Sequence, residues 1–198
     1  MENLMKNRFS CRNFKDEKVD DKVINEILSL TMLSPSSLGL EPWKFIVISK
    51  KDDLESLSAI CYGQNQVKTC SHAIIVLART DLQSQDKFLK DVIHNKNKTK
   101  TVDAFFERVA SRTDAMSKDE LYHYASLQCY LATANLVNLA FEKDVKSCII
   151  GGFEHKNLDK FLNLSKDLKS CLVIALGKSD EVASEKIRMS FGSVVEWK

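Results

Sequence analysis

Two short cationic patterns lie near the two ends of the sequence. Arg8, Ser10 and Arg12 are spaced by two, so an extended strand would place all three side chains on one face. Two guanidinium groups and a hydroxyl on one face suit an oxygen-rich anion, because arginine binds such groups through paired hydrogen bonds. Lys186 and Arg188 repeat the spacing near the other end. Since domain termini often lie close together, the two patterns could form one phosphate site, although either alone could be a solvated basic stretch.

Two further segments combine turn residues with apolar runs. Residues 34–43 read Ser-Pro-Ser-Ser-Leu-Gly-Leu-Glu-Pro-Trp and contain both prolines of the chain. Pro42 favours an extended conformation for Glu41. Residues 149–153 read Ile-Ile-Gly-Gly-Phe, and the missing Cβ atoms would let a flat ligand approach the backbone amides. Taken singly, the first segment is also typical of a helix-to-strand connection and the second of a plain turn.

Other chemistries find little support. The chain has no GxGxxG, GxxxxGK(S/T) or GxSxG motif, and its cysteines and histidines form no CxxC, HxxxH or mixed cluster, so we expect no metal site. A thiol-based redox regulator at Cys11 is an open alternative, because neighbouring arginines lower a thiol pKa. Strand alternation would point Cys11 away from Arg8 and Arg12, which counts against it. We expect Cys148, within an apolar strand, to be a packing residue.

The composition is that of an ordinary globular protein. The chain has 198 residues, of which 44% are hydrophobic and 28% charged. This predicts a single domain, 1–198, with a core large enough to need no disulfides. The net charge of +2 gives no support for nucleic-acid binding. We find neither a signal-peptide pattern nor an uncharged apolar run of membrane-spanning length, and therefore expect a cytoplasmic protein that contacts no membrane.

Alternating helices and strands must position these patterns. Apolar residues at helical spacing follow Asp20 and Asp21, and Ser117 with Glu120 fits a capping box before a segment, 121–141, that is apolar nearly all the way round. We expect that last helix in the middle of the fold. The predicted helices cover 20–31, 52–60, 83–94, 102–112, 117–141 and 157–163; the predicted strands cover 43–48, 73–78, 145–150 and 172–176, with 194–197 as an extra strand. The fold class is α+β, an α/β sandwich around one sheet.

The order of the patterns is more specific than any one of them. Along the chain come Arg-x-Ser-x-Arg, SPSSxxxxPW, a strand ending in Ile-Gly-Gly-Phe, and Lys-x-Arg. This order resembles the FMN-dependent nitroreductase family over residues 6–190, and the run 147–153 is most similar to its oxygen-insensitive members. The resemblance implies a nitroreductase-like fold with a central mixed sheet flanked by helices and a long buried core helix. It also implies a homodimer with the flavin at the subunit interface.

The resemblance implies flavin-binding roles for the matching residues. Arg12 would lie by N1 and O2 of the ring, where a cation stabilises the charge of reduced flavin. The amides of Gly151 and Gly152 would meet N5 and O4, and the segment 35–37 would reach the ring from the partner subunit. The implied cofactor-binding residues are Arg8, Phe9, Ser10, Arg12, Pro35, Ser36, Ser37, Gly39, Gln66, Ile150, Gly151, Gly152, Lys186 and Arg188.

The implied activity is that of an NAD(P)H-dependent flavin oxidoreductase. In such an enzyme a hydride from NADPH or NADH reaches flavin N5, and a nitroaromatic, quinone or flavin acceptor then takes two electrons in a ping-pong scheme. No catalytic side chain is expected, because the flavin carries the chemistry. Phe105 and Phe106 are candidates for a substrate wall. The lysines of the basic loop (Lys96, Lys98 and Lys100) could favour NADPH through its 2′-phosphate or be merely solvated. The alternative function is a non-enzymatic flavin carrier or sensor with a degenerate site, as Gly39, Gly63 and Gly151 replace polar residues of known members.

Overall fold

Two apolar strands, β2 (His72–Arg79) and β4 (Leu168–Gly177), form the centre of the computed structural model, which describes residues 1–96 and 101–198. Most residues of both strands are buried, as expected of strands that are covered on both faces. β1 (Trp43–Ile48) and β3 (Lys146–Ile150) flank them in the order β1-β2-β4-β3, and all three pairings are antiparallel. The sheet is therefore antiparallel and not mixed as expected; the described residues add one isolated parallel bridge, between Ser10 and Ser147 of β3.

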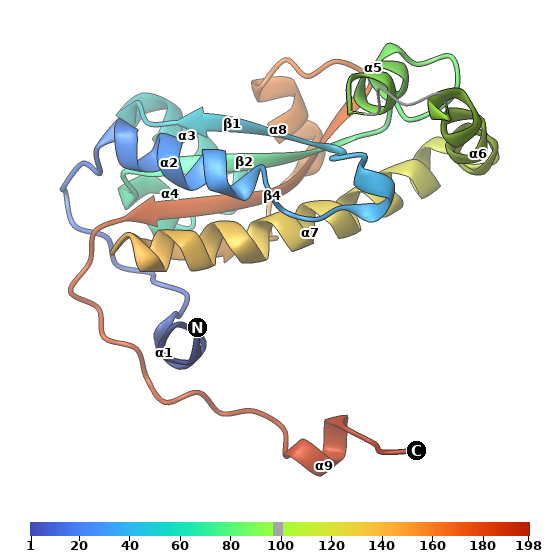
Figure 1. The fold of residues 1–198 in the computed structure, drawn as a ribbon. Helices are drawn as coiled ribbons and strands as arrows, with labels where there is room; N and C mark the ends of the chain where they lie inside the picture. The colour runs from blue at the N-terminus through green and yellow to red at the C-terminus, as the bar shows by residue number, and fades with distance from the viewer. Residues whose placement is uncertain (97–100) are drawn as a thin grey trace.

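The long helix α7 (Lys118–Glu142) covers one face of the sheet together with α2 (Asp21–Thr31) (Figure 1). The predicted capping box is confirmed: the Ser117 hydroxyl accepts from the Glu120 amide, and the Glu120 carboxylate accepts from the Ser117 amide at 2.8 Å. One stripe of α7 packs on alternate residues of β2, including Ile74 and Val76. The helix is therefore a core element, as predicted.

The other residues of β2, among them Ile75 and Leu77, face a second apolar cluster. It is covered by α3 (Lys51–Ile60), α4 (Asn65–Thr69) and α8 (His155–Phe161). The sequence predicted α3 and α8 within a few residues but not the short α4. The architecture is thus a helix–sheet–helix sandwich, which confirms the predicted fold class.

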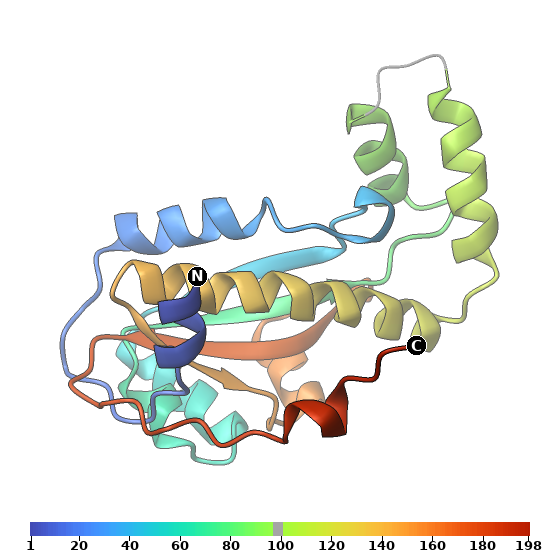
Figure 2. The same ribbon diagram turned by 60° about the horizontal axis from the view of Figure 1, so that its bottom comes forward.

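A helical pair projects from one end of the sandwich (Figure 2). It consists of α5 (Lys87–Lys96) and α6 (Val102–Asp114), and its own small core includes Leu89, Ile93 and Val109. The 3-10 helix η1 (Ser37–Gly39) lies beside this pair. Part of the predicted basic loop 95–100 is helical, since α5 extends to Lys96; residues 97–100 lie outside the described part of the chain.

Both ends of the chain differ from the prediction. The N-terminus forms a short helix, α1 (Glu2–Asn7), before the extended segment that starts at Arg8. The expected extra strand at 194–197 is wrong: the helix α9 (Phe191–Val194) overlaps it, and residues 195–198 are irregular. A strand needs a ladder partner whatever its residues prefer, and no pairing of this segment occurs within the described ranges. Across residues 1–96 and 101–198, no helix combines the length and apolarity needed to cross a bilayer.

Candidate functional site

The N-terminal segment is fixed against β3. Ser10 bridges Ser147, and the Cys11 amide donates to the Ser147 carbonyl at 2.9 Å. Cys11 is fully buried while the adjacent Arg12 is exposed, as strand alternation requires. Burial raises the pKa of the Cys148 thiol on β3, and the nearby positive charge of Arg12 acts in the opposite direction. Arg12 therefore lies near the strand that ends at Ile150.

Cations from both ends of the chain meet beside β3, an edge strand of the sheet; we call this place the cationic edge. The Lys186 ammonium donates to the Met5 carbonyl, which places it beside the first turn of the chain. Partial desolvation lowers the pKa of Lys186, and the charges of Arg8 and Arg188 lower it further. Within the described residues, no ion pair joins Arg8, Arg12, Lys186 or Arg188 to a carboxylate. The structure thus gathers unpaired positive charge here.

A carboxylate that the sequence analysis missed holds the two ends together. One oxygen of Glu181 accepts hydrogen bonds from the amides of Arg12 at 2.9 Å and Asn13 at 3.0 Å, and the Cys11 thiol lies 3.4 Å away. These amides hold the pKa of Glu181 below its usual range. Glu181 therefore fixes the backbone that presents Arg12. No local pattern marks a lone glutamate in a loop for this role.

The glycine pair after β3 has no explanation within the chain itself. A Cβ atom added at Gly151 would meet nothing within 4 Å, and at Gly152 it would make only ordinary contacts from 3.7 Å. Neither glycine has a positive φ, unlike Gly39 and Gly63. Packing and conformation would both accept a larger residue at 151, so the open backbone there is free to meet a ligand.

Two glutamines support this turn. Gln64 Nε2 donates to the Gly152 carbonyl at 2.9 Å, and Gln66 Nε2 donates to Gln64 Oε1 at 2.7 Å. Gln66, predicted to touch the flavin, is largely buried. It contacts Gln64, and Gln64 in turn contacts the glycine turn. Tyr62, which is exposed at a positive φ of 58°, flanks the same glycine. Gln64 and Tyr62 were missed because both reach Gly152 through contacts that are distant in sequence.

Pro35, Ser36, Ser37 and Gly39 lie elsewhere in the same chain. Both views place η1 beside α5 near the N-terminal end of α7, whereas α1 lies beside the C-terminal half of α7 (Figures 1 and 2). Side chains of α7 hold η1: Gln128 Oε1 accepts from the Ser37 amide at 2.9 Å, and the Tyr124 hydroxyl donates to the Ser37 carbonyl at 3.4 Å. One chain therefore does not bring these predicted residues to the cationic edge.

The expected extended conformation of Glu41 is wrong. Its φ is 46°, in the left-handed region, as are those of Leu38 (58°) and Gly39 (65°). The Glu41 amide donates to Ser36 Oγ at 2.9 Å, and its carboxylate pairs with Lys96. These contacts override the preference that Pro42 imposes on the residue before it.

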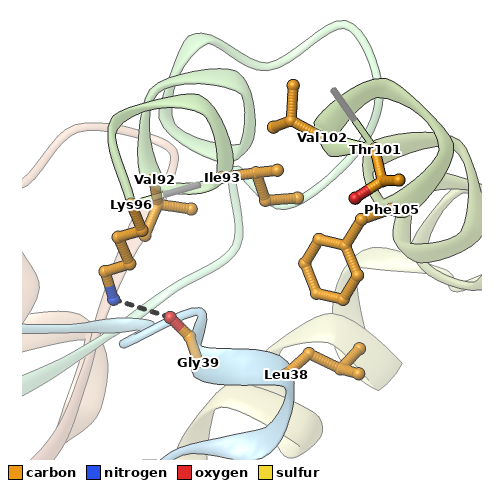
Figure 3. Close-up of a pocket in the computed structure, with 8 residues that line it drawn as sticks. All are labelled: Leu38, Gly39, Val92, Ile93, Lys96, Thr101, Val102 and Phe105. Carbon is orange, nitrogen blue, oxygen red and sulfur yellow. Dashed lines mark hydrogen bonds between the residues drawn. The ribbon is translucent and has the colours of Figure 1, made fainter. Parts of the chain in front are cut away.

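A cavity of about 390 Å³ separates η1 from the α5–α6 pair (Figure 3). Leu38, Ile93 and Phe105 contribute apolar walls, so the predicted wall residue Phe105 does line a pocket. Phe106 packs against His94 with ring centroids 5.5 Å apart. Lys96 lies at one side, where its ammonium donates to the Gly39 carbonyl at 2.7 Å and to the Glu41 carboxylate. This engagement disfavours the predicted NADPH contact for Lys96; Lys98 and Lys100 lie outside the described residues.

The cysteines do not form a reactive site. All six are buried, and burial raises the pKa of Cys11, the residue on which a thiol regulator would depend. A thiol mechanism needs an accessible thiolate, so this alternative is disfavoured. Cys148 is buried in the sheet, as expected for a packing residue. In the described ranges, no group of three or more His, Cys, Asp or Glu side chains is arranged to hold a metal.

A model of the nitroreductase family matches residues 5–178. This chain belongs to the nitroreductase family. The match covers the Arg-x-Ser-x-Arg segment, the η1 region and the glycine pair, and it confirms the resemblance seen in the sequence. It also makes the protein an oxidoreductase by family.

Curated relatives cover nearly the whole of this nitroreductase. YfkO of Bacillus subtilis, a provisionally named NAD(P)H nitroreductase, is 32% identical over 201 residues, covering 92% of this chain and 89% of its own. The oxygen-insensitive NADPH nitroreductase of Helicobacter pylori is 28% identical over 200 residues, covering 98% and 94%.

Solved structures show the same fold. A nitroreductase family protein from Streptococcus pneumoniae superposes with a TM-score of 0.89 at 25% identity, covering 100% of this chain and 99% of its own. A provisionally named nitroreductase from Exiguobacterium sibiricum, solved in complex with FMN, gives a TM-score of 0.88 at 22% identity, covering 100% and 96%. The helix–sheet–helix sandwich is therefore the nitroreductase fold.

Proposed function

We propose that residues 1–198 form a single FMN-binding domain of a homodimeric oxidoreductase that carries electrons from NAD(P)H to nitroaromatic, quinone or flavin acceptors. The observation that carries the proposal is the open Gly151–Gly152 backbone at the same edge as the unpaired cations. A flat group with an anionic tail needs both features. The FMN complex of the Exiguobacterium relative supports the choice of cofactor.

The residues at this edge fit FMN chemically. Arg8, Lys186 and Arg188 supply positive charge that could bind a phosphate. Among the described residues, no carboxylate forms an ion pair with these three cations. Arg12 supplies a fixed cation for the pyrimidine end of the ring, held by Glu181 through its own backbone amide. The turn at Gly151 and Gly152 leaves amides open to the ring edge, and Gln64 holds that turn in place. FMN bound there would supply the hydride chemistry, while these side chains bind and orient it.

A second subunit would complete the site. Pro35–Ser37 and Gly39 lie apart from the cationic edge within one chain, so they can contribute only from a neighbour. The surface also needs a partner: Leu127, Tyr130 and Leu131 face outward on α7, and apolar residues of the C-terminal arm (180–198) are exposed. Large apolar residues exposed in this number mark an interface. A homodimer would cover it and supply the missing residues.

An absorbance titration with FMN tests the proposal. We expect the protein to bind FMN and the bound flavin to bleach when NADPH or NADH is added without oxygen. Arg8→Ala and Arg188→Ala should weaken FMN binding on the order of tenfold each, because each removes a charge-assisted contact. The matched control is Lys156→Ala, which removes an exposed cation on α8.

Three outcomes separate the alternatives. Bound flavin that bleaches and is reoxidised by a nitroaromatic or quinone supports the proposed oxidoreductase. Bound flavin that bleaches poorly with both nucleotides would instead indicate a flavin carrier or sensor. Failure of the wild-type protein to bind excess FMN would reject the proposal altogether.

A further inference from the structure

The loop 36–41 is strained and is held by contacts from two helices. Leu38, Gly39 and Glu41 all have positive φ, and two of them are not glycine. Such conformations persist only where the surroundings enforce them. On one side, Gln128 and Tyr124 of α7 bind Ser37. On the other side, Leu40 packs against Leu89 and Ile93 of α5. The polar contacts that the described residues of α5 make with the strained residues come from Lys96.

Lys96 joins two parts of this loop at once. Its ammonium donates to the Gly39 carbonyl at 2.7 Å and pairs with the Glu41 carboxylate, and Figure 3 shows it reaching across the cavity wall to the loop. Both partners are about 40% exposed, so the pair is only partly screened by water. A charged donor that satisfies a carbonyl and a carboxylate together favours the curled loop over an extended one.

We propose that Lys96 is a positioning residue that holds loop 36–41 in its strained conformation and so presents Ser36, Ser37 and Gly39 to the neighbouring subunit. The second part of this inference rests on the proposed function, because it needs a flavin at the interface. The first part does not, since the loop and its contacts lie within one chain. Lys96 and Gly39 also line the cavity that Leu38 and Phe105 line, which links the loop to the wall that an acceptor would meet.

Amide hydrogen exchange of the flavin-free protein tests the first part. Four backbone amides of the loop donate hydrogen bonds in the strained conformation: those of Ser37, Gly39, Leu40 and Glu41. In Lys96→Met, which keeps the apolar stem, we expect a peptide spanning 36–41 to exchange about fivefold faster. Lys96→Arg should restore slow exchange, because a guanidinium can reach both oxygens. Glu41→Gln should speed exchange, and adding it to Lys96→Met should have little further effect.

The matched control is Lys87→Met on the same helix. Lys87 forms an exposed ion pair with Asp91 of α5 and does not contact the loop. It should leave exchange of 36–41 unchanged. Equal exchange in wild type and Lys96→Met, or equal acceleration by Lys87→Met, would overturn the inference.

FMN titration of the same variants tests the second part. Lys96→Met should bind FMN about fivefold more weakly than wild type and Lys87→Met, with Lys96→Arg close to wild type. Faster loop exchange with unchanged FMN affinity would overturn the claim that the loop positions the flavin. A wild-type protein that binds no FMN would instead reject the proposed function, while the exchange result would still decide the role of Lys96.

Discussion

At the scale of single residues, the glycines of this chain serve different purposes. Gly177 is required by packing, because an added Cβ would lie 2.7 Å from Phe14 Cδ1. Gly39 and Gly63 are suited to their positive φ values. At Gly151 neither close packing nor a positive φ requires glycine, so we attribute its small size to a ligand that binds there. The contrast can be measured.

We expect Gly151→Val to fold as the wild type does, with a free energy of unfolding within about 0.5 kcal/mol, because its new atoms enter open space. Its affinity for FMN should fall on the order of tenfold, since overpacking a contact costs about 1–3 kcal/mol. Gly177→Ala should do the reverse, losing about 1–2 kcal/mol of stability and keeping its FMN affinity. Urea unfolding and flavin titration measure the two quantities; unchanged FMN binding by Gly151→Val would contradict the assignment of the glycine pair.

His72 should make stability depend on pH. It is buried at the start of β2, with Nε2 3.1 Å from Asp21 Oδ1 and Nδ1 2.9 Å from Ser71 Oγ. Burial lowers its pKa below the usual 6.5, with Asp21 acting in the opposite direction. The unfolded chain therefore binds more protons just below pH 6.5 than the folded protein does. The stability that neutral His72 contributes is complete above that pH and is lost as the pH falls toward the folded pKa.

Urea unfolding at several pH values between about 5 and 8 checks this expectation. The free energy of unfolding should decrease as the pH falls below about 6.5, and His72→Gln should flatten that part of the profile. His123→Gln, which alters an exposed histidine on α7, should keep the wild-type slope. An identical slope in His72→Gln would mean that other groups cause the pH dependence.

At the scale of elements, α7 contacts both the core of the fold and the loop 36–41. It packs on the sheet and on α2, and it supplies Gln128 and Tyr124 to the loop. Ser117→Ala should remove its N-cap and lower the free energy of unfolding by about 1 kcal/mol. Ser56→Ala, which removes an exposed hydroxyl within α3, should change it by less than about 0.5 kcal/mol. Equal loss in both variants, measured by urea unfolding, would show that the cap is not the cause.

Elements with strong local signals could be predicted from the sequence. Ser117 and Glu120 predicted α7, and apolar runs predicted all four strands. In β2 and β4 the apolar runs reflect burial on both faces of the sheet. Glu41 and the tail 194–197 were misjudged, because a local preference lost to contacts or lacked a partner strand. The cation and glycine patterns of the candidate site were also local, and therefore visible.

The supporting residues could not be predicted in this way. Glu181 acts on Arg12 across 169 residues, Gln64 on Gly152 across 88, and Lys96 on Glu41 across 55. A lone polar residue carries no sign of the backbone group that it will meet once the chain has folded. The sequence marked only Lys96 of these three, and for a different role, a nucleotide contact; the structure shows the backbone and side-chain groups that each of them holds.

At the scale of the whole molecule, the C-terminal arm leaves much apolar surface uncovered. Six large apolar residues of the arm are each at least 67% exposed: Val182, Ile187, Met189, Phe191, Val194 and Trp197. Such exposure is unusual for a monomer, and Figure 1 shows the arm leading away from the sandwich. The proposed homodimer would bury these residues against the second copy.

Replacing two of them should weaken that association. We expect wild-type protein to sediment as a dimer and Phe191→Ser with Trp197→Ser to shift the equilibrium toward monomer, by about 1.5–3 kcal/mol per buried side chain lost. Met1→Ser removes an exposed apolar residue outside the arm and serves as the control. Analytical ultracentrifugation over a concentration series measures the shift. A wild-type protein that stays monomeric at high concentration would reject the dimer.

The hydrogen bonds that Glu181 makes with Arg12 and Asn13 also order events during synthesis. Residues 10–13 are translated well before their partners, because Ser147 and Glu181 lie far downstream in the chain. Glu181 follows Arg12 by 169 positions, so ribosomes working at about 5–20 residues per second need roughly 10–30 s to supply this partner. Over that time the Arg12 and Asn13 amides lack their carboxylate partner, so the cationic edge is complete only after residue 181 has been translated.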